Sequence, residues 1–184
     1  MTDNLTASKV DIPPFALFSH AFAGRLREKD VIEFLGFLNS LSTYRFTGVY
    51  RFEPGWVVSL ALFDRTNPAT TLGSNVKMKE SYCWLTGLGD TSYIIEDAQA
   101  DLRLHNHAAI EEVRSYVAVL LKDTHGQPWG TLCHFDFVPR VAQPGTIETL
   151  DLYRPVIEEF FVRDTPSRWD PDAPSIARPV GVGN

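Results

Sequence analysis

The sequence predicts a single α+β domain in which an antiparallel sheet lies between helices near the two ends of the chain. A helical pattern with a period near 3.6 occupies residues 29–42, and another begins at residue 146. Between them, short apolar runs alternate with tight turns. Strands joined by tight turns pair antiparallel, and helices at both ends can then cover the sheet. A length of 184 residues suits one domain with a sizeable core.

The charge and the cysteine content exclude several classes of protein. Seventeen basic residues stand against 23 acidic ones, whereas a nucleic-acid-binding protein normally carries a basic stripe. No apolar run approaches the ~20 residues of a membrane helix, and the polar N-terminus does not resemble a signal peptide. Two cysteines in 184 residues indicate a reducing compartment. We therefore expect a cytoplasmic protein that binds neither nucleic acid nor a membrane.

The first predicted helix of the domain follows an N-terminal arm. Residues 1–24 are largely polar, apart from an apolar stretch at 15–22 that can form a helix. Asp30 can then cap a helix over 29–42, because Glu33 follows at the spacing of a capping box. One face of this helix is apolar at near-3.6 spacing, through Val31, Leu35, Leu38 and Leu41.

A hairpin follows this helix. Aromatic side chains recur at alternate positions of residues 44–53, with polar and charged ones between them, which predicts a half-buried strand. Pro54 and Gly55 form a turn, because proline fixes φ and glycine allows a positive φ. Residues 56–63 are apolar on both faces and supply the returning strand. The aromatic face comprises Tyr44, Phe46, Tyr50 and Phe52.

The second half of the chain ends in a further hairpin and a helix. Residues 116–121 and 129–138 are predicted strands, and Gly126 suits a left-handed turn position between them. Thr146 can cap the last helix, which Pro155 should kink or restart. The domain is placed at 25–163, followed by an extended or disordered tail at 164–184. Shorter patterns predict a strand at 75–80, helical turns at 81–88, a strand at 93–95 and a short helix at 108–113.

A series of short motifs occupies residues 81–140. It runs Ser81-Tyr82-Cys83, Ile95-Glu96-Asp97-Ala98, Asp101-Leu102-Arg103, Ser115-Tyr116-Val117-Ala118-Val119, Gly126, Gly130-Thr131-Leu132-Cys133-His134-Phe135-Asp136 and Pro139-Arg140. In this order the series resembles the GAF domain, a sensory α+β module. The resemblance covers roughly residues 25–163. It implies an antiparallel sheet of five to six strands, terminal helices on one face that often form a dimer bundle, and a ligand pocket on the other face.

The resemblance also limits the ligand and the activity. GAF domains bind cyclic nucleotides, bilins, haem or small metabolites, but the Asn-Lys-Phe-Asp-Glu set of cyclic-nucleotide binders and the bilin-attachment context of phytochromes are not visible here. The free methionine-R-sulfoxide reductases are enzymes with this fold and a cluster of cysteines. The resemblance places Cys83 at the position of one of these cysteines, but the cysteine expected near His105 is missing. No motif in the sequence identifies a cofactor.

Ten side chains are candidates for contact with a ligand. The aromatic candidates would wall a largely apolar pocket. Arg103 and Arg114 can hold an anion, or else pair with nearby carboxylates. His134 can contact a ligand from the sheet, or form a buried polar pair with Asp136. The ten are Tyr82, Cys83, Trp84, Asp97, Asp101, Arg103, His105, Arg114, Tyr116 and His134.

The cysteines and a histidine pair have both structural and functional interpretations. Cys83 and Cys133 are either small buried hydrophobic residues or a redox-sensing pair. Their separation of 50 residues fits no metal spacing, and we expect them to be reduced and far from disulfide geometry. His105 and His107 are either surface histidines or two ligands of a metal. We assign no catalytic or metal-binding residue.

These observations favour a non-enzymatic sensor. We expect a small ligand, favoured as anionic, to bind between the sheet and residues 82–114. We expect a homodimer through the helices at 29–42 and 146–163, because their broad apolar stripes exceed what one sheet can cover. The sensor would then signal through the dimer or through a signalling protein in trans. The alternative is a redox enzyme related to the free methionine-R-sulfoxide reductases, acting through Cys83.

Overall fold

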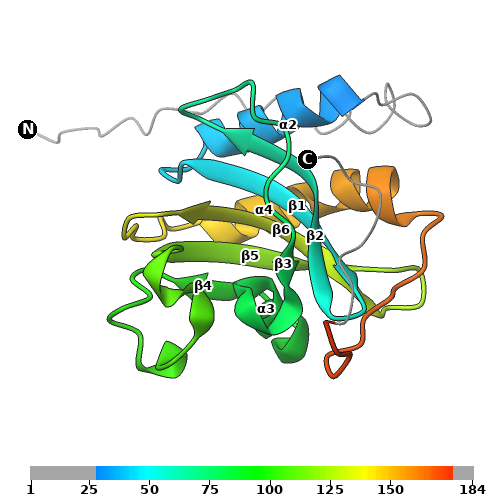
Figure 1. The fold of residues 1–184 in the computed structure, drawn as a ribbon. Coiled ribbons are helices and arrows are strands. Elements are labelled where there is room, and N and C mark those ends of the chain that lie inside the picture. The colour runs from blue at the N-terminus through cyan, green and yellow to red at the C-terminus, as the bar shows by residue number, and fades with distance from the viewer. Residues whose placement is uncertain (1–27, 176–184) are drawn as a thin grey trace, which may run out of the picture.

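The computed structural model describes residues 28–175, and within them lies a six-stranded antiparallel sheet (Figure 1). The strand order is β3-β2-β1-β6-β5-β4, so the two predicted hairpins lie side by side through β1 and β6. The α+β class and the sheet of five to six strands are thereby confirmed. The strands are β1 (Phe46–Glu53), β2 (Trp56–Asp64), β3 (Val76–Lys77), β4 (Tyr93–Ile95), β5 (Ser115–Lys122) and β6 (Pro128–Asp136).

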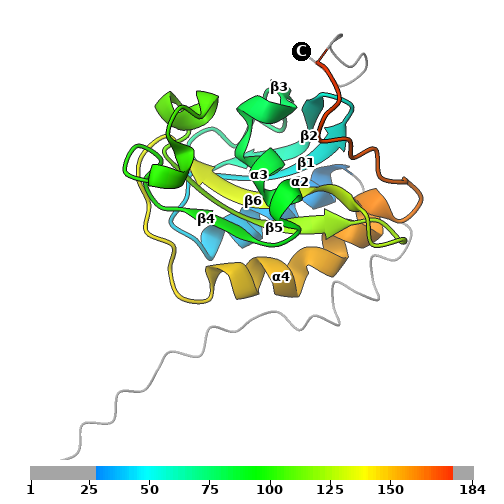
Figure 2. The same ribbon diagram turned by 90° about the horizontal axis from the view of Figure 1, so that it is seen from below.

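One face of the sheet is covered by the helices at the two ends of the described chain. These are α2 (Glu28–Ser40) and α4 (Thr146–Ile157), and Figure 2 shows α4 below the sheet. The apolar stripe of α2 is buried against the sheet, as its spacing predicts. The helix begins at Glu28, so Asp30 lies inside the first turn and does not cap it. The arm at 1–24 lies outside the described residues.

The opposite face carries shorter elements. Helix α3 (Tyr82–Gly89) lies over β5 and β6, and three 3₁₀ turns, η1 (Met78–Glu80), η2 (Leu102–Leu104) and η3 (Ala108–Glu111), flank it within residues 28–175 (Figure 2). A second cluster of buried residues, separate from the one under α2 and α4, fills this layer. The sheet therefore separates two cores, one under the helices and one beneath the loops.

The expectation that residues 44–53 form a half-buried strand is wrong. Strand β1 lies in the middle of the sheet, and Thr47 and Val49 are buried on the helix side. Tyr50 and Phe52 are buried on the other side. Tyr44 precedes the strand and joins the helix-side core, away from the aromatic residues grouped with it in sequence. Both faces of β1 are covered, because helices pack on one face of the sheet and loops pack on the other.

The C-terminal helix continues through Pro155 instead of ending there. It passes into a π-helical segment, η4 (Glu158–Val162), directly after the proline turn. In this wider turn, backbone N–H of Arg163 donates to the Glu158 carbonyl at 3.1 Å. The helix begins after Gly145, whose φ of 86° only glycine adopts readily, so Thr146 is its first residue and not its cap.

The segment from residue 163 to residue 175 is extended and lies against the end of the sheet. The Trp169 ring lies 4.4 Å from the Phe52 ring and beside Gly87 of α3. Backbone N–H of Ser167 donates to Asp123 Oδ2 at 2.9 Å, and the Ser175 hydroxyl donates to the Gly55 carbonyl. This segment therefore joins the helix side of the molecule to α3 on the opposite side.

From Glu28 to Ser175, no helix has the length and apolar character needed to cross a membrane.

Candidate functional site

A cavity of about 720 Å³ lies on the sheet face opposite α2 and α4. Its floor comes from β1, β5 and β6, and its walls come from α3, η3, β3 and the loop at 70–75. The loop is held in place because backbone N–H of Ser59 donates to Asn75 Oδ1 at 3.0 Å and N–H of Gly73 donates to Ser59 Oγ at 2.9 Å. The volume is within the range of small-molecule sites.

Seven aromatic residues contribute to the lining of the cavity, together with aliphatic and polar ones. Phe46 stacks on Phe135 with ring centroids 4.7 Å apart, and Tyr82 lies 5.7 Å from Tyr116. Rings held against one another keep their orientation, so the lining is largely preformed. The aromatic lining comprises Phe46, Tyr50, Trp56, Tyr82, Tyr116, Phe135 and Phe137.

Few charged groups reach this cavity. Lys77 and Glu80 pair at its edge with Nζ and Oε1 3.1 Å apart, and Glu112 is exposed at the rim. Trp56 is one of the lining residues, and its Nε1 is buried and meets no hydrogen-bond acceptor within residues 28–175. A buried donor without a partner is unfavourable, so an acceptor on a bound molecule would relieve it.

The two cysteines meet at the wall of the cavity. Cys83 is the second residue of α3, and Cys133 lies on β6 between Gly48 of β1 and Ala118 of β5. Their side chains are within hydrogen-bonding range of each other, and both line the cavity. Helix α3 crosses over β6 and so brings together two cysteines that lie 50 positions apart in the sequence. Both are free and buried, as expected for reduced cysteines.

The surroundings of the two thiols differ. Cys83 Sγ accepts a hydrogen bond from Thr131 Oγ1 at 3.2 Å. Contact with the Cys133 thiol, and hydrogen bonds from Ser81, Thr131 and Tyr116, lower the pKa of Cys83 to about 6 despite the opposing effect of burial. Burial raises the pKa of Cys133 well above its usual range, and the neighbouring Cys83 adds to this. Cys83 is therefore the thiol that ionises first.

Three of the ten candidate residues line the cavity: Tyr82, Cys83 and Tyr116. Trp84 packs behind them against the same core, without reaching the lining. His105 is exposed, outside the lining. His107 lies closer, with its ring 4.8 Å from Tyr82 and its Nδ1 accepting from backbone N–H of Ala109 at 3.2 Å.

The acidic and arginine candidates pair with one another outside the cavity lining. Arg103 contacts the Asp101 carboxylate and donates to the Ile94 carbonyl at 2.8 Å. Arg114 Nη2 donates to Asp97 Oδ1 at 2.7 Å. The sequence allowed these arginines either to hold an anion or to pair with nearby carboxylates, and in the structure they pair with carboxylates. These pairs lower the pKa values of both carboxyl groups, with the arginine hydrogen bonds as the main cause.

His134 lies on the helix side of the sheet, away from the cavity. Asn39 Nδ2 donates to Thr47 Oγ1 at 2.9 Å, and the Thr47 hydroxyl is hydrogen-bonded to His134 Nδ1 at 2.7 Å. The imidazole is 1% exposed, and burial together with the Arg65 charge lowers its pKa to about 3. His134 is therefore neutral and structural in this arrangement.

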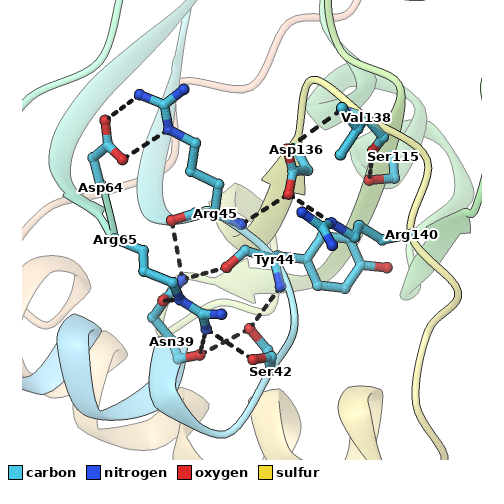
Figure 3. A network of polar contacts seen from close by, with 10 residues as sticks. All are labelled: Asn39, Ser42, Tyr44, Arg45, Asp64, Arg65, Ser115, Asp136, Val138 and Arg140. Carbon is cyan, nitrogen blue, oxygen red and sulfur yellow. Dashed lines mark hydrogen bonds and ion pairs between the residues drawn. The ribbon is translucent and has the colours of Figure 1, made fainter. Parts of the chain in front are cut away.

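Asp136, which could have paired with His134, belongs instead to a network at the end of the sheet (Figure 3). Its carboxylate accepts from backbone N–H of Arg45 at 3.1 Å and from Arg140 Nε at 2.8 Å. Arg45 also contacts both oxygens of Asp64, and Arg65 donates to Asn39 Oδ1 at 2.8 Å. This network ties α2, β1, β2 and β6 together and does not reach the cavity.

The cavity also includes residues that sequence reasoning did not select, chiefly Phe46, Tyr50, Trp56 and Cys133. The alternation of aromatic residues in 44–53 indicated that Phe46 and Tyr50 share a face, but not that this face is the cavity floor. No signal in the sequence marks Trp56 as a lining residue. In the described part of the chain, no three His, Cys, Asp or Glu side chains converge as a metal site would require.

No family model and no curated protein matches this sequence. Solved structures do match its fold. The type II free methionine-R-sulfoxide reductase of Thermoplasma acidophilum is 18% identical, with 74% of this chain and 95% of that one covered and a TM-score of 0.55. The chromophore-binding domain of Stigmatella aurantiaca phytochrome P1 is 12% identical, with 88% and 63% covered and a TM-score of 0.60.

A third solved structure is a GAF domain by its own description. The GAF domain of an Acinetobacter phosphoenolpyruvate-protein phosphotransferase is 12% identical, with 69% of this chain and 76% of that one covered and a TM-score of 0.54. At these identities the likeness concerns the fold alone. Together with the strand order and the position of the terminal helices, it shows that the described residues have a GAF-like fold.

Proposed function

We propose that this chain is a small-molecule sensor that binds its ligand in the aromatic cavity. The observation that supports this most is the cavity itself, about 720 Å³ in volume and lined by rings held against one another. Apolar pockets with few polar groups are typical of ligand sites. Trp56 Nε1 would supply the directional contact, because it is buried without an acceptor among the described residues.

The lining favours an aromatic or largely apolar molecule with at least one hydrogen-bond acceptor. An anionic ligand has little support, because Arg103 and Arg114 pair with carboxylates and Lys77 pairs with Glu80. Glu112 adds a negative charge at the rim. A neutral ring system that accepts from Trp56 meets these conditions without burying an unpaired charge.

The signal would leave through the helix side. Leu152 of α4 is 51% exposed, in line with a homodimer through this helix. Phe37 of α2 is not suited to contact a second copy of the chain, because its ring packs edge-on against Tyr153, with the ring centroids 5.6 Å apart. The segment around Trp169 connects α3 to the helix side, so a ligand that shifts α3 would act on it.

Fragment binding, measured by ligand-observed NMR, tests the proposed site. The probes are a set of aromatic acids, aromatic amines and neutral aromatic molecules, with the protein kept reduced. Ala109 lines the cavity from η3, so Ala109→Trp should obstruct it and weaken binding, whereas the matched exposed change Ala100→Trp should not. Equal binding by both variants would place the fragments elsewhere and refute the site.

A redox enzyme is the second candidate, because the two cysteines meet at the cavity and solved free methionine-R-sulfoxide reductases share the fold. The assay supplies free methionine-R-sulfoxide with thioredoxin as the reductant. A reductase would turn over substrate and lose this activity in Cys83→Ser. Absence of turnover by the wild-type protein would remove this candidate.

A further inference from the structure

Two thiols share one wall of the cavity, and their surroundings give them different chemistry. Cys83 Sγ accepts a hydrogen bond from Thr131 Oγ1 and lies at the N-terminal end of α3, where the helix dipole favours a negative charge. Cys133 Sγ donates toward the Gly48 carbonyl at 3.6 Å and so keeps its proton. The pair thus combines a thiol that can ionise with a neighbour that remains protonated.

We propose that Cys83 and Cys133 are a peroxide-oxidised thiol pair, in which an organic hydroperoxide enters the aromatic cavity and converts them reversibly into a disulfide. This inference goes beyond ligand sensing, since the reaction needs no resident ligand. The aromatic lining provides the selectivity for an organic oxidant over hydrogen peroxide.

The chemistry proceeds in two balanced steps. The Cys83 thiolate attacks one peroxide oxygen, the O–O bond breaks, and the departing alkoxide takes up a proton to leave as an alcohol, so that Cys83 becomes a sulfenic acid. Cys133 Sγ then attacks the Cys83 sulfur, the S–O bond breaks, and water leaves with the thiol proton. Two thiols are oxidised by two electrons in total, while one hydroperoxide is reduced to an alcohol and water.

Burial does not prevent this reaction, because the thiols open onto the cavity. Cys83 is 4% exposed and Cys133 1% exposed, but both line the same space as the aromatic rings. The titratable groups that face them are Tyr50 of β1 and Tyr116 of β5, and burial raises the pKa values of both phenols. These neighbours therefore stay neutral and do not oppose a thiolate at Cys83.

The test treats the reduced full-length protein with cumene hydroperoxide or hydrogen peroxide and follows free thiols and intact mass. We expect both thiols to disappear with a loss of about 2 Da, and dithiothreitol to restore them. Cumene hydroperoxide should react about tenfold faster than hydrogen peroxide, which corresponds to ~1.4 kcal/mol of apolar contact. Ala109→Trp should remove that advantage, whereas Ala100→Trp should keep it.

Single substitutions separate the roles of the two thiols. In Cys133→Ser the reaction should stop at a Cys83 sulfenic acid, which dimedone traps. In Cys83→Ser the remaining thiol should stay reduced over the same period. Thr131→Val removes the hydroxyl donor while preserving shape, and should slow oxidation in a protein whose melting temperature shows that it is folded.

The proposal is overturned if the folded wild-type protein keeps both thiols under excess peroxide. It is equally overturned if Cys83→Ser oxidises at the wild-type rate, or if only disulfides between separate chains form. Fragment binding is measured separately, with the protein kept reduced in dithiothreitol. If the thiols do not oxidise, the sensor proposal still stands. If no fragment binds, the proposal of an oxidisable thiol pair still stands.

Discussion

Acid should weaken this fold through one buried imidazole. His134 is 1% exposed, with Nδ1 bonded to the Thr47 hydroxyl and a pKa lowered from 6.5 to about 3 by burial and the Arg65 charge. Because the native ring resists protonation, the unfolded state binds more protons as the pH falls. Stability is therefore lost from about pH 6.5 downward and the loss is complete near pH 3.

The size of this loss follows from the two pKa values. Between about pH 8 and about pH 5, the His134 contribution to the free energy of unfolding should fall by about 2 kcal/mol, as an order of magnitude. The full difference of the pKa values corresponds to ~5 kcal/mol, an upper bound because water penetration relieves part of the penalty.

Urea unfolding of wild type and His134→Gln at several pH values isolates this group. The glutamine amide oxygen can still accept from Thr47 but does not titrate, so His134→Gln should lose less stability on acidification than wild type does. His125→Gln, at an exposed position, is the matched control and should behave as wild type. Parallel pH profiles for wild type and His134→Gln would show that His134 is not held neutral, which would refute the reasoning.

Three further outcomes follow from the packing and the surface. Gly130→Ala should lower the free energy of unfolding in urea by about 3 kcal/mol, because a Cβ there would lie 2.1 Å from the Tyr50 carbonyl oxygen. The control Gly89→Ala should have little effect, because a Cβ there meets only ordinary van der Waals contact. Trp169→Ala should cost about 1–3 kcal/mol through lost ring contacts with β1; an unchanged midpoint would mean the segment is not docked. Leu152→Glu should convert a homodimer into monomers in ultracentrifugation, Leu102→Glu should not, and a monomeric wild type would end the dimer proposal.

The two hairpins were predictable because their signals are local. Pro54 and Gly55 mark one turn and Gly126, with a φ of 77°, marks another, so both strand pairs form as predicted. The central position of β1 was not predictable from its alternating pattern. Its two charged residues are paired: Arg51 contacts Glu53, and Glu53 also pairs at 2.6 Å with Arg168, far away in sequence. A pattern that reads as half exposed can therefore belong to a buried strand when distant ion pairs satisfy its charges.

The candidate site, too, was predictable only in part. Tyr82, Cys83 and Tyr116 were found because they belong to motifs on α3 and β5 that border the cavity. The meeting of Cys83 with Cys133 was missed, since it depends on how α3 crosses the sheet and not on spacing along the chain. Arg103 and Arg114 lie near the site in sequence, but neighbouring carboxylates hold them outside the cavity lining.

The indole signals of a ¹H–¹⁵N NMR spectrum test the central claim most directly. Trp56 Nε1 is buried at the cavity without an acceptor in the described part of the chain, and Trp129 Nε1 is buried in the helix-side core in the same condition. An aromatic fragment bound in the cavity should shift the Trp56 indole signal, identified by its loss in Trp56→Phe, and leave that of Trp129 in place. If the fragment set leaves the Trp56 signal unmoved, or moves both signals equally, the cavity is not the binding site.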